Sequence, residues 1–311
     1  MASQLIRRDS ALGKLGKRDI AFQHGALLKW RYEVKKILAI GGVGEIYTAN
    51  DMAESREVIV KTPWIERARE KHILQLFENE KKALERLSSA PDVVDLLDSG
   101  ISLGAPFLVL EHLGFRNLHY EHTADPMEVM LLFCKICDAL EHVHDAGIVH
   151  RDVKPDNIFI VENGIKLIDF QYSKVPGLVD YALSACHPVG SAEFMAPEQT
   201  YHSPAKDVDP RADIYAFGVS MYMLAGRKYS WYEANPMPYI IDNGLEWPDF
   251  VDACIQQHRR GKPVPLHPRF ERAPPRLSEI IGKTLQKDPD KRYQSVAELK
   301  KDLVDFMIDR L

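Results

Sequence analysis

Short runs of apolar residues alternate with polar ones in the first part of the chain. From Trp30 the sequence reads RYEVKKILAI, a glycine-rich turn, IYTAND and EVIVK, and the apolar runs VVDLL and PFLVLEHL follow later. Runs of this length that are rich in β-branched residues favour strands. Between them, residues 66–88 carry apolar side chains close to helical spacing, at Ile73, Leu76, Phe77, Leu84 and Leu87. The pattern predicts a small antiparallel sheet with one helix.

The pattern becomes helical after Leu113. The segment MEVMLLFCKICDALEHVHDAG has helical periodicity and ends at Gly147, a common helix stop signal. From residue 211 onward, helical patterns alternate with a proline-rich stretch at 232–275. We therefore predict an α+β protein with a small β lobe over residues 30–113 and a larger, mainly helical lobe over 114–311. A basic segment, residues 1–29, precedes them as a mobile arm or as a strap over the small lobe.

Composition excludes several classes of function. The 311 residues suit two lobes, and 45% hydrophobic with 27% charged residues is ordinary for a globular protein. A formal net charge of −5 argues against nucleic-acid binding as the main activity. Four cysteines form no disulfide framework and the N-terminus is not signal-like, so we expect a reducing cytoplasm. The most apolar stretch, 214–226, is shorter than the roughly 20 residues that span a bilayer, so no membrane segment is expected.

Two motifs carry the candidate chemistry. Residues 150–157 read HRDVKPDN, and IDFQ follows at 168–171. Asp152 can accept the proton of an incoming hydroxyl, and Lys154 can neutralise charge on a phosphoryl group. Asn157 and Asp169 carry oxygen atoms of the kind that Mg²⁺ prefers. This order of side chains is the one that phosphoryl transfer from ATP requires.

A glycine-rich turn lies upstream, between two predicted strands. Glycines allow backbone N–H groups to approach phosphates where a side chain would clash. Such a turn alone is weak support, because a hairpin without a ligand explains it equally well. Its context is the following strand EVIVK, which ends in Lys61. The turn itself reads Ala39-Ile40-Gly41-Gly42-Val43-Gly44-Glu45-Ile46-Tyr47.

In this order, the motifs resemble those of the eukaryotic-type (Hanks-type) protein kinases over roughly residues 32–305. The turn is similar to G-x-G-x-x-G-x-V, EVIVK to V-A-I-K, and GSAEFMAPEQ at 190–199 to G-T-x-x-Y-M-A-P-E. The short linkers look similar to those of bacterial members. The resemblance implies a bilobal fold that binds ATP and Mg²⁺ in a cleft. It leaves open whether the chain is part of a longer protein.

The resemblance implies a role for each matching residue. Asp152 and Lys154 would act at the transferred phosphoryl group, and Lys61 would contact the α- and β-phosphates. Glu80 would hold Lys61, with Glu78 and Glu85 as competitors. The metal ligands implied are Asn157 and Asp169. The implied nucleotide contacts, with Leu110 as gatekeeper and the backbone of Glu111 and Leu113 at the adenine edge, are Ala39, Ile40, Gly41, Gly42, Gly44, Ile46, Ile59, Lys61, Leu110, Glu111, Leu113 and Phe159.

Further matching residues would hold the site together. Ser191 would bridge Asp152 and Lys154, and Asp213 would brace the backbone of the catalytic loop. Glu198 would pair with Arg292 near the C-terminus. Phe170 and His150 would pack into a hydrophobic spine that Leu84 and Leu96 complete. These residues have structural roles, so their loss should affect stability first.

Three positions depart from the family pattern. Gln171 replaces the glycine of D-F-G, Ala39 replaces the first glycine of the turn, and Ile59 replaces the alanine of V-A-I-K. A residue other than glycine at 171 should bias the backbone toward one arrangement. These departures motivate an alternative, a nucleotide-binding pseudokinase or scaffold. A small-molecule phosphotransferase of the aminoglycoside-kinase type is a second alternative, but A-P-E at 196–198 and Lys154 count against it.

The form HRDxKPxN is that of the serine/threonine kinases, so the expected substrates are proteins, this chain itself included. Because Arg151 precedes Asp152, the chain resembles the class of kinases in which a phosphate on the activation loop pairs with this arginine. The loop at 171–190 offers Tyr172, Ser173, Tyr181 and Ser184, and we expect Ser184 to be the regulatory site.

Weaker signals have plainer explanations. Cys134 and Cys137, followed by His142 and His144, suggest zinc, but buried cysteines of a core helix explain them better. Arg7-Arg8-Asp9-Ser10 resembles a phosphorylation site, although a solvated arm is the simpler reading. The segment 229–275 could dock a partner or pack on the helical lobe.

Overall fold

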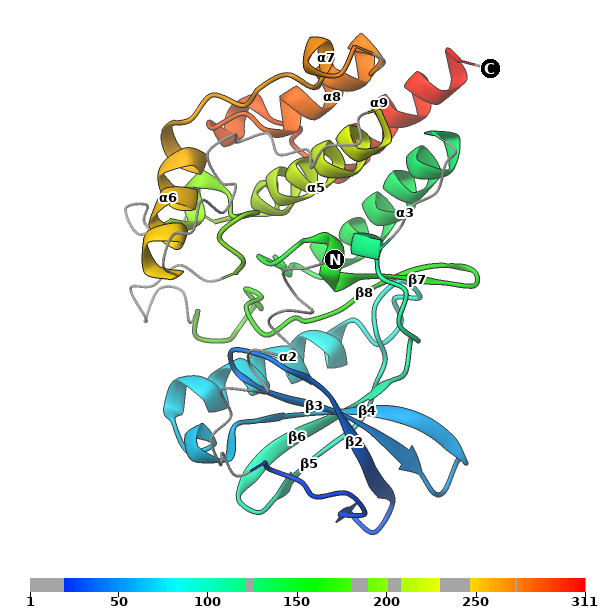
Figure 1. The fold of residues 1–311 in the computed structure, drawn as a ribbon, viewed down its shortest axis with the longest axis vertical. Coiled ribbons are helices and arrows are strands. Elements are labelled where there is room, and N and C mark those ends of the chain that lie inside the picture. Colours follow the sequence, from blue (N-terminus) through cyan, green and yellow to red (C-terminus); the bar gives the residue numbers. More distant parts are fainter. Residues whose placement is uncertain are drawn as a thin grey trace. The chain divides into compact units, whose positions relative to one another are not determined.

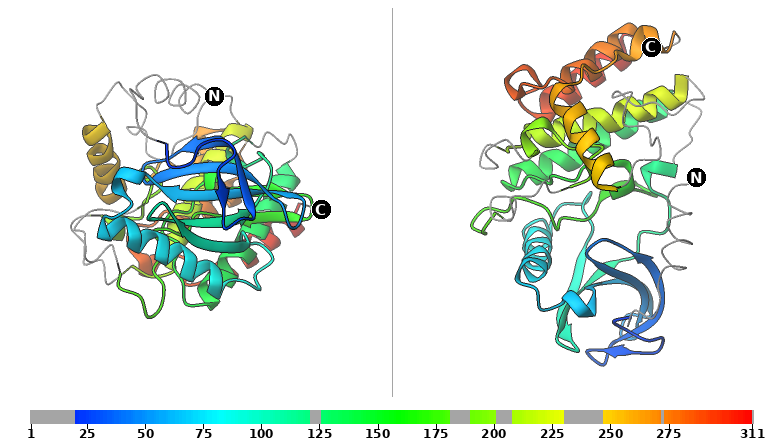
Figure 2. Two further views of the ribbon diagram at one scale, coloured as in Figure 1. Left: turned by 90° about the horizontal axis from the view of Figure 1, so that it is seen from below. Right: turned by 60° about the vertical axis from the view of Figure 1, so that its left-hand side comes forward.

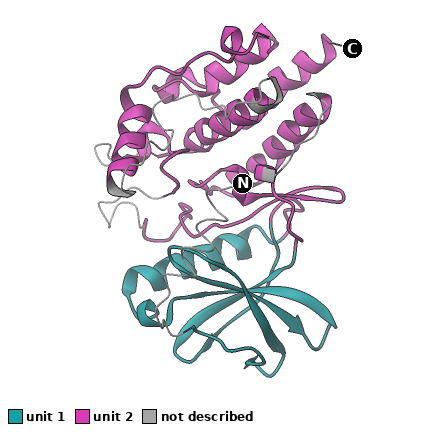
Figure 3. Ribbon diagram, viewed as in Figure 1, with its two compact units in different colours: residues 1–88, 94–112 teal, residues 89–93, 113–311 magenta. Residues whose placement is uncertain are grey.

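A computed structural model describes residues 20–120, 126–180, 190–200, 208–229, 247–271 and 273–310 of the chain. These residues fall into two compact units (Figure 3). Unit 1 comprises residues 1–88 and 94–112, and unit 2 comprises 89–93 and 113–311. The candidate phosphorylation sites Ser10 and Ser184 lie outside the described residues, as do residues 232–246 and 272 of the proline-rich stretch.

Unit 1 is built on a six-stranded antiparallel sheet with the order β1-β2-β3-β4-β6-β5 (Figure 1). Its hydrophobic core lies on one face, where Tyr32, Val34, Val58 and Val60 are almost fully buried. The strands are β1 (Leu27–Leu28), β2 (Tyr32–Ile40), β3 (Gly44–Asp51), β4 (Arg56–Pro63), β5 (Leu96–Ser102) and β6 (Ala105–Glu111).

The strand predicted at VVDLL, residues 93–97, is shifted toward the C-terminus in the structure. The run VVDLL forms a strand only from Leu96 onward, and Val93 instead bridges to Leu167 in unit 2. β5 continues through DSGIS, whose glycine and polar residues gave no strand signal. Gly100 is needed there because a Cβ would lie 2.8 Å from the ring of Phe107. The close contact between Gly100 on β5 and the Phe107 ring on β6 therefore explains why a glycine lies within this strand.

In the described part of unit 1, one α-helix, α2 (Lys71–Arg86), accompanies the sheet and packs on β5 and β6 (Figure 2). It realises the predicted helical spacing, since Ile73, Leu76, Phe77 and Leu84 are all buried. Glu80 lies on the same inward face and is only 1% exposed. A carboxylate so deeply buried needs a partner.

Ala21 and Phe22, which precede the sheet, are hydrogen-bonded to side chains of β3. The backbone N–H of Ala21 donates to the Glu45 carboxylate (2.9 Å), and that of Phe22 donates to the Tyr47 hydroxyl (3.1 Å). The Tyr47 hydroxyl in turn donates to Glu45. The Phe22 ring is 2% exposed and packs edge-on against Phe107. Residues 20–22 thus cover the core of the sheet as a strap.

Truncating Phe22 to alanine should lower the free energy of unfolding by about 3 kcal/mol, because a buried ring leaves a cavity between β3 and β6. Urea denaturation followed by tryptophan fluorescence measures the loss. Phe22→Leu is the matched control and should cost clearly less, since it keeps most of the apolar volume. Equal unfolding midpoints for Phe22→Ala and the wild type would show that the strap contributes nothing.

Unit 2 is mainly helical. Its long helices α3 and α9 pack together, α5 packs against α8, and the Phe133 and Phe217 rings meet edge-on at 5.8 Å between α3 and α5. The β7–β8 hairpin packs on α3. Among the described residues, no helix is both long and apolar enough to span a membrane. The elements are α3 (Pro126–Asp145), β7 (Ile158–Val161), β8 (Gly164–Leu167), α5 (Arg211–Tyr229), α6 (Trp247–Arg260), α7 (Leu266–Arg269), α8 (Pro275–Thr284) and α9 (Val296–Ile308).

The predicted fold class, an antiparallel β lobe with a helical lobe, is confirmed. Cys134 and Cys137 are buried in α3, and burial raises the pKa of both thiols. The histidines that follow them have carboxylate partners, since His142 contacts Asp92 and His144 contacts Asp213, each at 2.9 Å. The structure therefore gives these four residues separate packing and hydrogen-bonding roles.

Candidate active site

The lysine of EVIVK is paired within unit 1. The Lys61 ammonium lies 2.7 Å from a Glu80 carboxylate oxygen, and both side chains are largely buried. Of the other candidate acids, Glu85 instead pairs with Lys82 on the exposed side of α2. A buried pair of this kind fixes the lysine at one place on β4.

The predicted nucleotide contacts on the sheet share one face. Strand register pairs Ala39 with Ile46, Ile46 with Lys61, and Ile59 with Leu110. Directly paired residues and residues two apart on a strand point to the same side of a sheet. The face is therefore apolar around the Lys61 ammonium. It lies opposite the face that carries the hydrophobic core.

The glycine-rich turn closes by a hydrogen bond from the Gly41 N–H to the Gly44 carbonyl (2.8 Å). A Cβ on Gly44 would lie 2.1 Å from the Thr62 carbonyl oxygen, so only glycine fits there. Gly42 has open space at its Cβ position. The Trp64 indole N–H donates to the Gly41 carbonyl (3.2 Å) and holds the turn to the end of β4. Ile40 is the last residue of β2.

The other predicted nucleotide contacts come from the strand end and from unit 2. The Glu111 N–H donates to the Asp95 carbonyl (3.1 Å), and Glu111 pairs with Val58 at the end of β6. Leu113 and Phe159 are half-buried in unit 2. Phe159 lies on β7 opposite Lys166.

In unit 2, the Asp152 carboxylate is the centre of a hydrogen-bonded group. One oxygen accepts from the Lys154 ammonium (2.9 Å) and the Asn157 amide (3.0 Å). The other accepts from the backbone N–H of Ser191 (2.7 Å). The side chain is only 2% exposed. Four residues predicted to act together, Asp152, Lys154, Asn157 and Ser191, are thus brought together.

Lys154 bridges this group to the segment at 190–199. Its ammonium also donates to the Ser191 hydroxyl (2.6 Å). Burial by itself would lower the pKa of Lys154, but the carboxylates of Asp152 and Asp169 outweigh burial and raise that pKa. The side chain is therefore a cation at neutral pH. It provides a fixed positive charge beside Asp152.

The backbone at residues 169–171 has a positive φ at Asp169, +68°, and not at Gln171. Phe170 is fully buried against the His150 ring at 4.6 Å, and the His150 ring nitrogen Nε2 lies 3.0 Å from the Ile168 carbonyl. Gln171 is 8% exposed and has no positive φ, so this backbone arrangement does not require glycine at that position.

Asp213 braces the loop as predicted. Its two oxygens accept the backbone N–H groups of His150 (2.9 Å) and Arg151 (2.8 Å). Burial alone would raise the pKa of the Asp213 carboxyl. The hydrogen bond with His144 and the electrostatic interactions with His144 and His150 outweigh burial and lower that pKa. The contribution of His144 was missed, because nothing local in the sequence links residues 69 positions apart.

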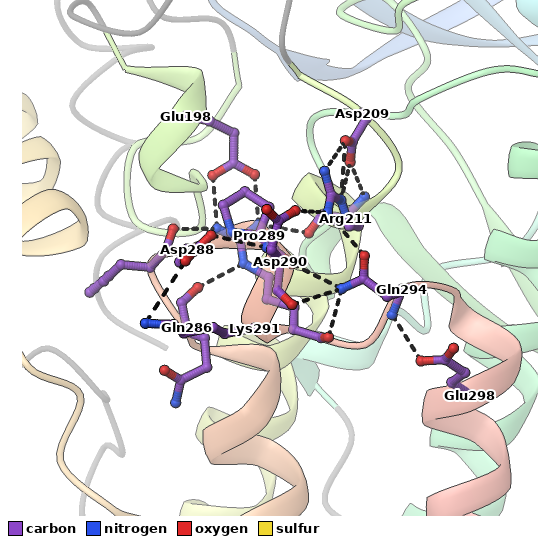
Figure 4. Close-up of polar contacts among 12 residues, drawn as sticks. Glu198, Asp209, Arg211, Gln286, Asp288, Pro289, Asp290, Lys291, Gln294 and Glu298 are labelled. Carbon is purple, nitrogen blue, oxygen red and sulfur yellow. Dashed lines mark hydrogen bonds and ion pairs between the residues drawn. The ribbon is translucent and has the colours of Figure 1, made fainter.

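Glu198 and Arg292 form a bidentate ion pair with distances of 2.6 and 2.8 Å. Figure 4 shows the Glu198 carboxylate with its two bonds. The Arg292 side chain is fully buried and also donates to the carbonyls of Gln286, Lys287 and Arg211. Next to it, the Arg211 guanidinium donates hydrogen bonds to the side-chain oxygens of Asp209, Asp290 and Gln294 (Figure 4). The pair fixes the end of the segment at 190–199 to the loop before α9.

His258 of α6 also holds this segment. Its Nε2 lies 2.9 Å from the Glu193 carbonyl and its Nδ1 lies 2.9 Å from the Tyr215 hydroxyl, which accepts a bond from Lys287. Burial, with the nearby Lys287 charge, lowers the pKa of His258 from 6.5 to about 3. The ring is therefore neutral in the folded protein.

Because unfolded His258 would bind a proton below its ordinary pKa of 6.5, acid should destabilise the protein through this residue. Between about pH 7 and about pH 5 the loss should be about 2 kcal/mol, and it continues as pH falls toward the folded pKa. Urea unfolding at both pH values should show a smaller loss for His258→Gln than for the wild type. The exposed His24 gives the control His24→Gln, which should behave as the wild type. Parallel pH profiles for all three proteins would refute the assignment.

Comparison with known proteins agrees with these features. The sequence profile described as the protein kinase domain matches residues 32–304. The serine/threonine-protein kinase PknB of Mycolicibacterium smegmatis is 31% identical over 287 residues, which cover 88% of this chain and 42% of that protein. The probable PknB of Corynebacterium glutamicum gives the same identity and coverage. A probable serine/threonine-protein kinase of Streptomyces coelicolor is 31% identical over 283 residues, 88% of this chain and 39% of that protein. The chain thus spans about two fifths of the length of these relatives.

Proposed function

Because this chain belongs to the protein kinase family, we propose that it transfers the γ-phosphoryl group of ATP to serine or threonine hydroxyls of proteins. The observation that carries the proposal is the hydrogen-bonded group around Asp152, in which Lys154, Asn157 and Ser191 hold one carboxylate. Relatives that match 88% of the chain are named serine/threonine-protein kinases, which supports the same acceptor.

Asp152 accepts the proton of the attacking hydroxyl in this proposal. Its carboxylate is held at both oxygens, so it is already oriented when the acceptor arrives. The Lys154 ammonium lies beside it and stabilises negative charge on the transferred group. Positioning and charge neutralisation supply most of the catalysis in phosphoryl transfer.

Asn157 and Asp169 fit a hard cation. The Asn157 amide nitrogen is used by Asp152, so the amide oxygen is the atom left to bind metal. Asp169 adds a carboxylate. When bound, Mg²⁺ would neutralise charge on the phosphates. The two side chains would hold the ion in unit 2.

Residues of unit 1 would bind the nucleotide. Ile46, Ile59 and Leu110 form an apolar face that suits a purine, and Lys61, held by Glu80, supplies a positive charge for phosphates. The glycine-rich turn offers backbone N–H groups. Ile59 is larger than the usual alanine, but flat apolar contact is what the adenine ring requires.

The acceptor class is tested with purified protein, radiolabelled ATP, Mg²⁺ and three peptides that differ only in bearing serine, threonine or tyrosine. We expect label on the serine and threonine peptides and on serine or threonine of the chain itself. Label on the tyrosine peptide alone, or on an aminoglycoside but on no peptide, would refute the proposal. Nucleotide binding without any transfer would favour the pseudokinase alternative.

We also propose that the chain acts in the cytoplasm.

A further inference from the structure

Arg151, the residue before Asp152, has its charge neutralised by an aspartate of the same unit. Its Nη1 and Nη2 donate to the two carboxylate oxygens of Asp180, both at 2.6 Å. The two side chains are 1% and 9% exposed. Parallel, charge-assisted bonds of this kind are the strongest and most directional that an arginine makes. The sequence predicts that the Arg151 guanidinium pairs with a phosphate on the loop, but in the structure it already pairs with the Asp180 carboxylate.

The backbone of Arg151 is strained and held from several sides. Its φ is +68°, a conformation that residues other than glycine adopt rarely. Its N–H donates to Asp213, and its carbonyl accepts from the Gln199 amide (3.0 Å). Gly190 approaches so closely that a Cβ there would lie 2.5 Å from the same carbonyl. The position of Asp152 depends on this residue, because the two are adjacent.

We propose that Asp180 is a positioning residue that holds Arg151, and through it Asp152, so that phosphoryl transfer needs no phosphate on the loop. This inference rests on the proposed kinase function. A carboxylate offers the same two acceptor oxygens to the guanidinium fork as a phosphate does. Unlike a phosphate, it is always present and no phosphatase removes it. A phosphate arriving at this place would meet the like charge of Asp180.

This assignment competes with the expectation that phosphorylation of Ser184 supplies the partner of Arg151. The two differ in what a phosphate-free protein does. If Asp180 suffices, removal of every phosphate leaves the catalytic loop in place. If a loop phosphate is required, the phosphate-free protein is inactive although Asp180 is present.

Asp180→Asn is the informative substitution, because it keeps the shape of the side chain and removes the charge. Asp209→Asn is the matched control, since Asp209 also holds an arginine, Arg211, by two oxygens but lies outside the catalytic loop. Asp180→Glu tests rescue by a restored charge, and Ser184→Ala removes the competing site. All variants and one wild-type sample are treated with phosphatase, and intact mass shows that no phosphate remains on them. A second wild-type sample is left phosphorylated for comparison.

Steady-state transfer to a serine peptide should give the same kcat for phosphate-free wild type, phosphorylated wild type and Ser184→Ala. Asp180→Asn should lose about a hundredfold in kcat. Its KM for ATP should change little, because Lys61 and the glycine-rich turn belong to unit 1. Asp180→Glu should recover part of kcat. A purely structural role would lower kcat equally in Asp209→Asn, or would lower thermal stability without lowering kcat.

Hydrogen–deuterium exchange of the peptide spanning 150–157 gives a readout without catalysis. Exchange should be faster in Asp180→Asn than in the wild type and Asp209→Asn. Unchanged exchange would overturn the inference even for a protein that transfers no phosphoryl group. Wild-type kcat in phosphate-free Asp180→Asn, or activity of the wild type only after loop phosphorylation, would overturn it as well.

Discussion

Asp152→Asn should lower kcat about a thousandfold, because it removes the proposed general base and an amide cannot accept the hydroxyl proton. An asparagine would also turn an N–H group toward either the Lys154 ammonium or the Ser191 N–H, where the carboxylate now accepts. ATP affinity should stay close to that of the wild type, since the lysine and the glycine-rich turn are in unit 1. Steady-state kinetics with a serine peptide and a direct nucleotide-binding titration measure the two quantities.

The same loop supplies the control for this substitution. Asp156 is four residues from Asp152, partly exposed, and its carboxylate lies 3.8 Å from the His119 ring. Asp156→Asn removes an equal charge from the loop without touching the hydrogen-bonded group, so it should keep most of kcat. If both variants lost activity to the same extent, net charge would be responsible rather than the Asp152 carboxylate.

The second large effect concerns stability. Arg292→Met should lower the free energy of unfolding by about 4 kcal/mol, because it leaves the Glu198 carboxylate without its buried partner. It also removes donors from three backbone carbonyls. Urea unfolding at neutral pH measures the loss, provided that the slope of the transition is unchanged.

An exposed arginine provides the comparison. Arg276 is half exposed and pairs with Glu279 at 3.2 Å on α8, so Arg276→Met should cost no more than about 0.5 kcal/mol. Equal destabilisation by the two substitutions would mean that burial of the Glu198–Arg292 pair is unimportant. A folded Arg292→Met protein with reduced kcat would show that the pair also shapes the segment at 190–199.

Much of the fold and site was predictable because the decisive patterns are local. The helical spacing of Ile73, Leu76 and Phe77 fixed which face of α2 is buried, and Glu80 shares that face. The spacing within HRDVKPDN placed Asp152, Lys154 and Asn157 on one tight loop, where they contact one another. The family profile over residues 32–304 agrees with these motifs.

Other features depend on contacts between distant residues and leave no pattern in the sequence. The Arg151–Asp180 and His144–Asp213 pairs join residues 29 and 69 positions apart. Positive φ values occur at Asp169 and Arg151 and not at Gln171, and no local sequence pattern marks these two positions. The strap at Phe22 is held by Glu45 and Tyr47, whose side chains gave no signal of such a role.

The central claim is that the group around Asp152 transfers phosphoryl groups, and one paired measurement tests it directly. Nucleotide binding and transfer of the γ-phosphoryl group to a serine peptide are measured in the same samples of wild type and Asp152→Asn. We predict that both proteins bind ATP and that only the wild type transfers phosphate at an appreciable rate. ATP binding by both proteins with transfer by neither, or equal transfer by both, would contradict the account.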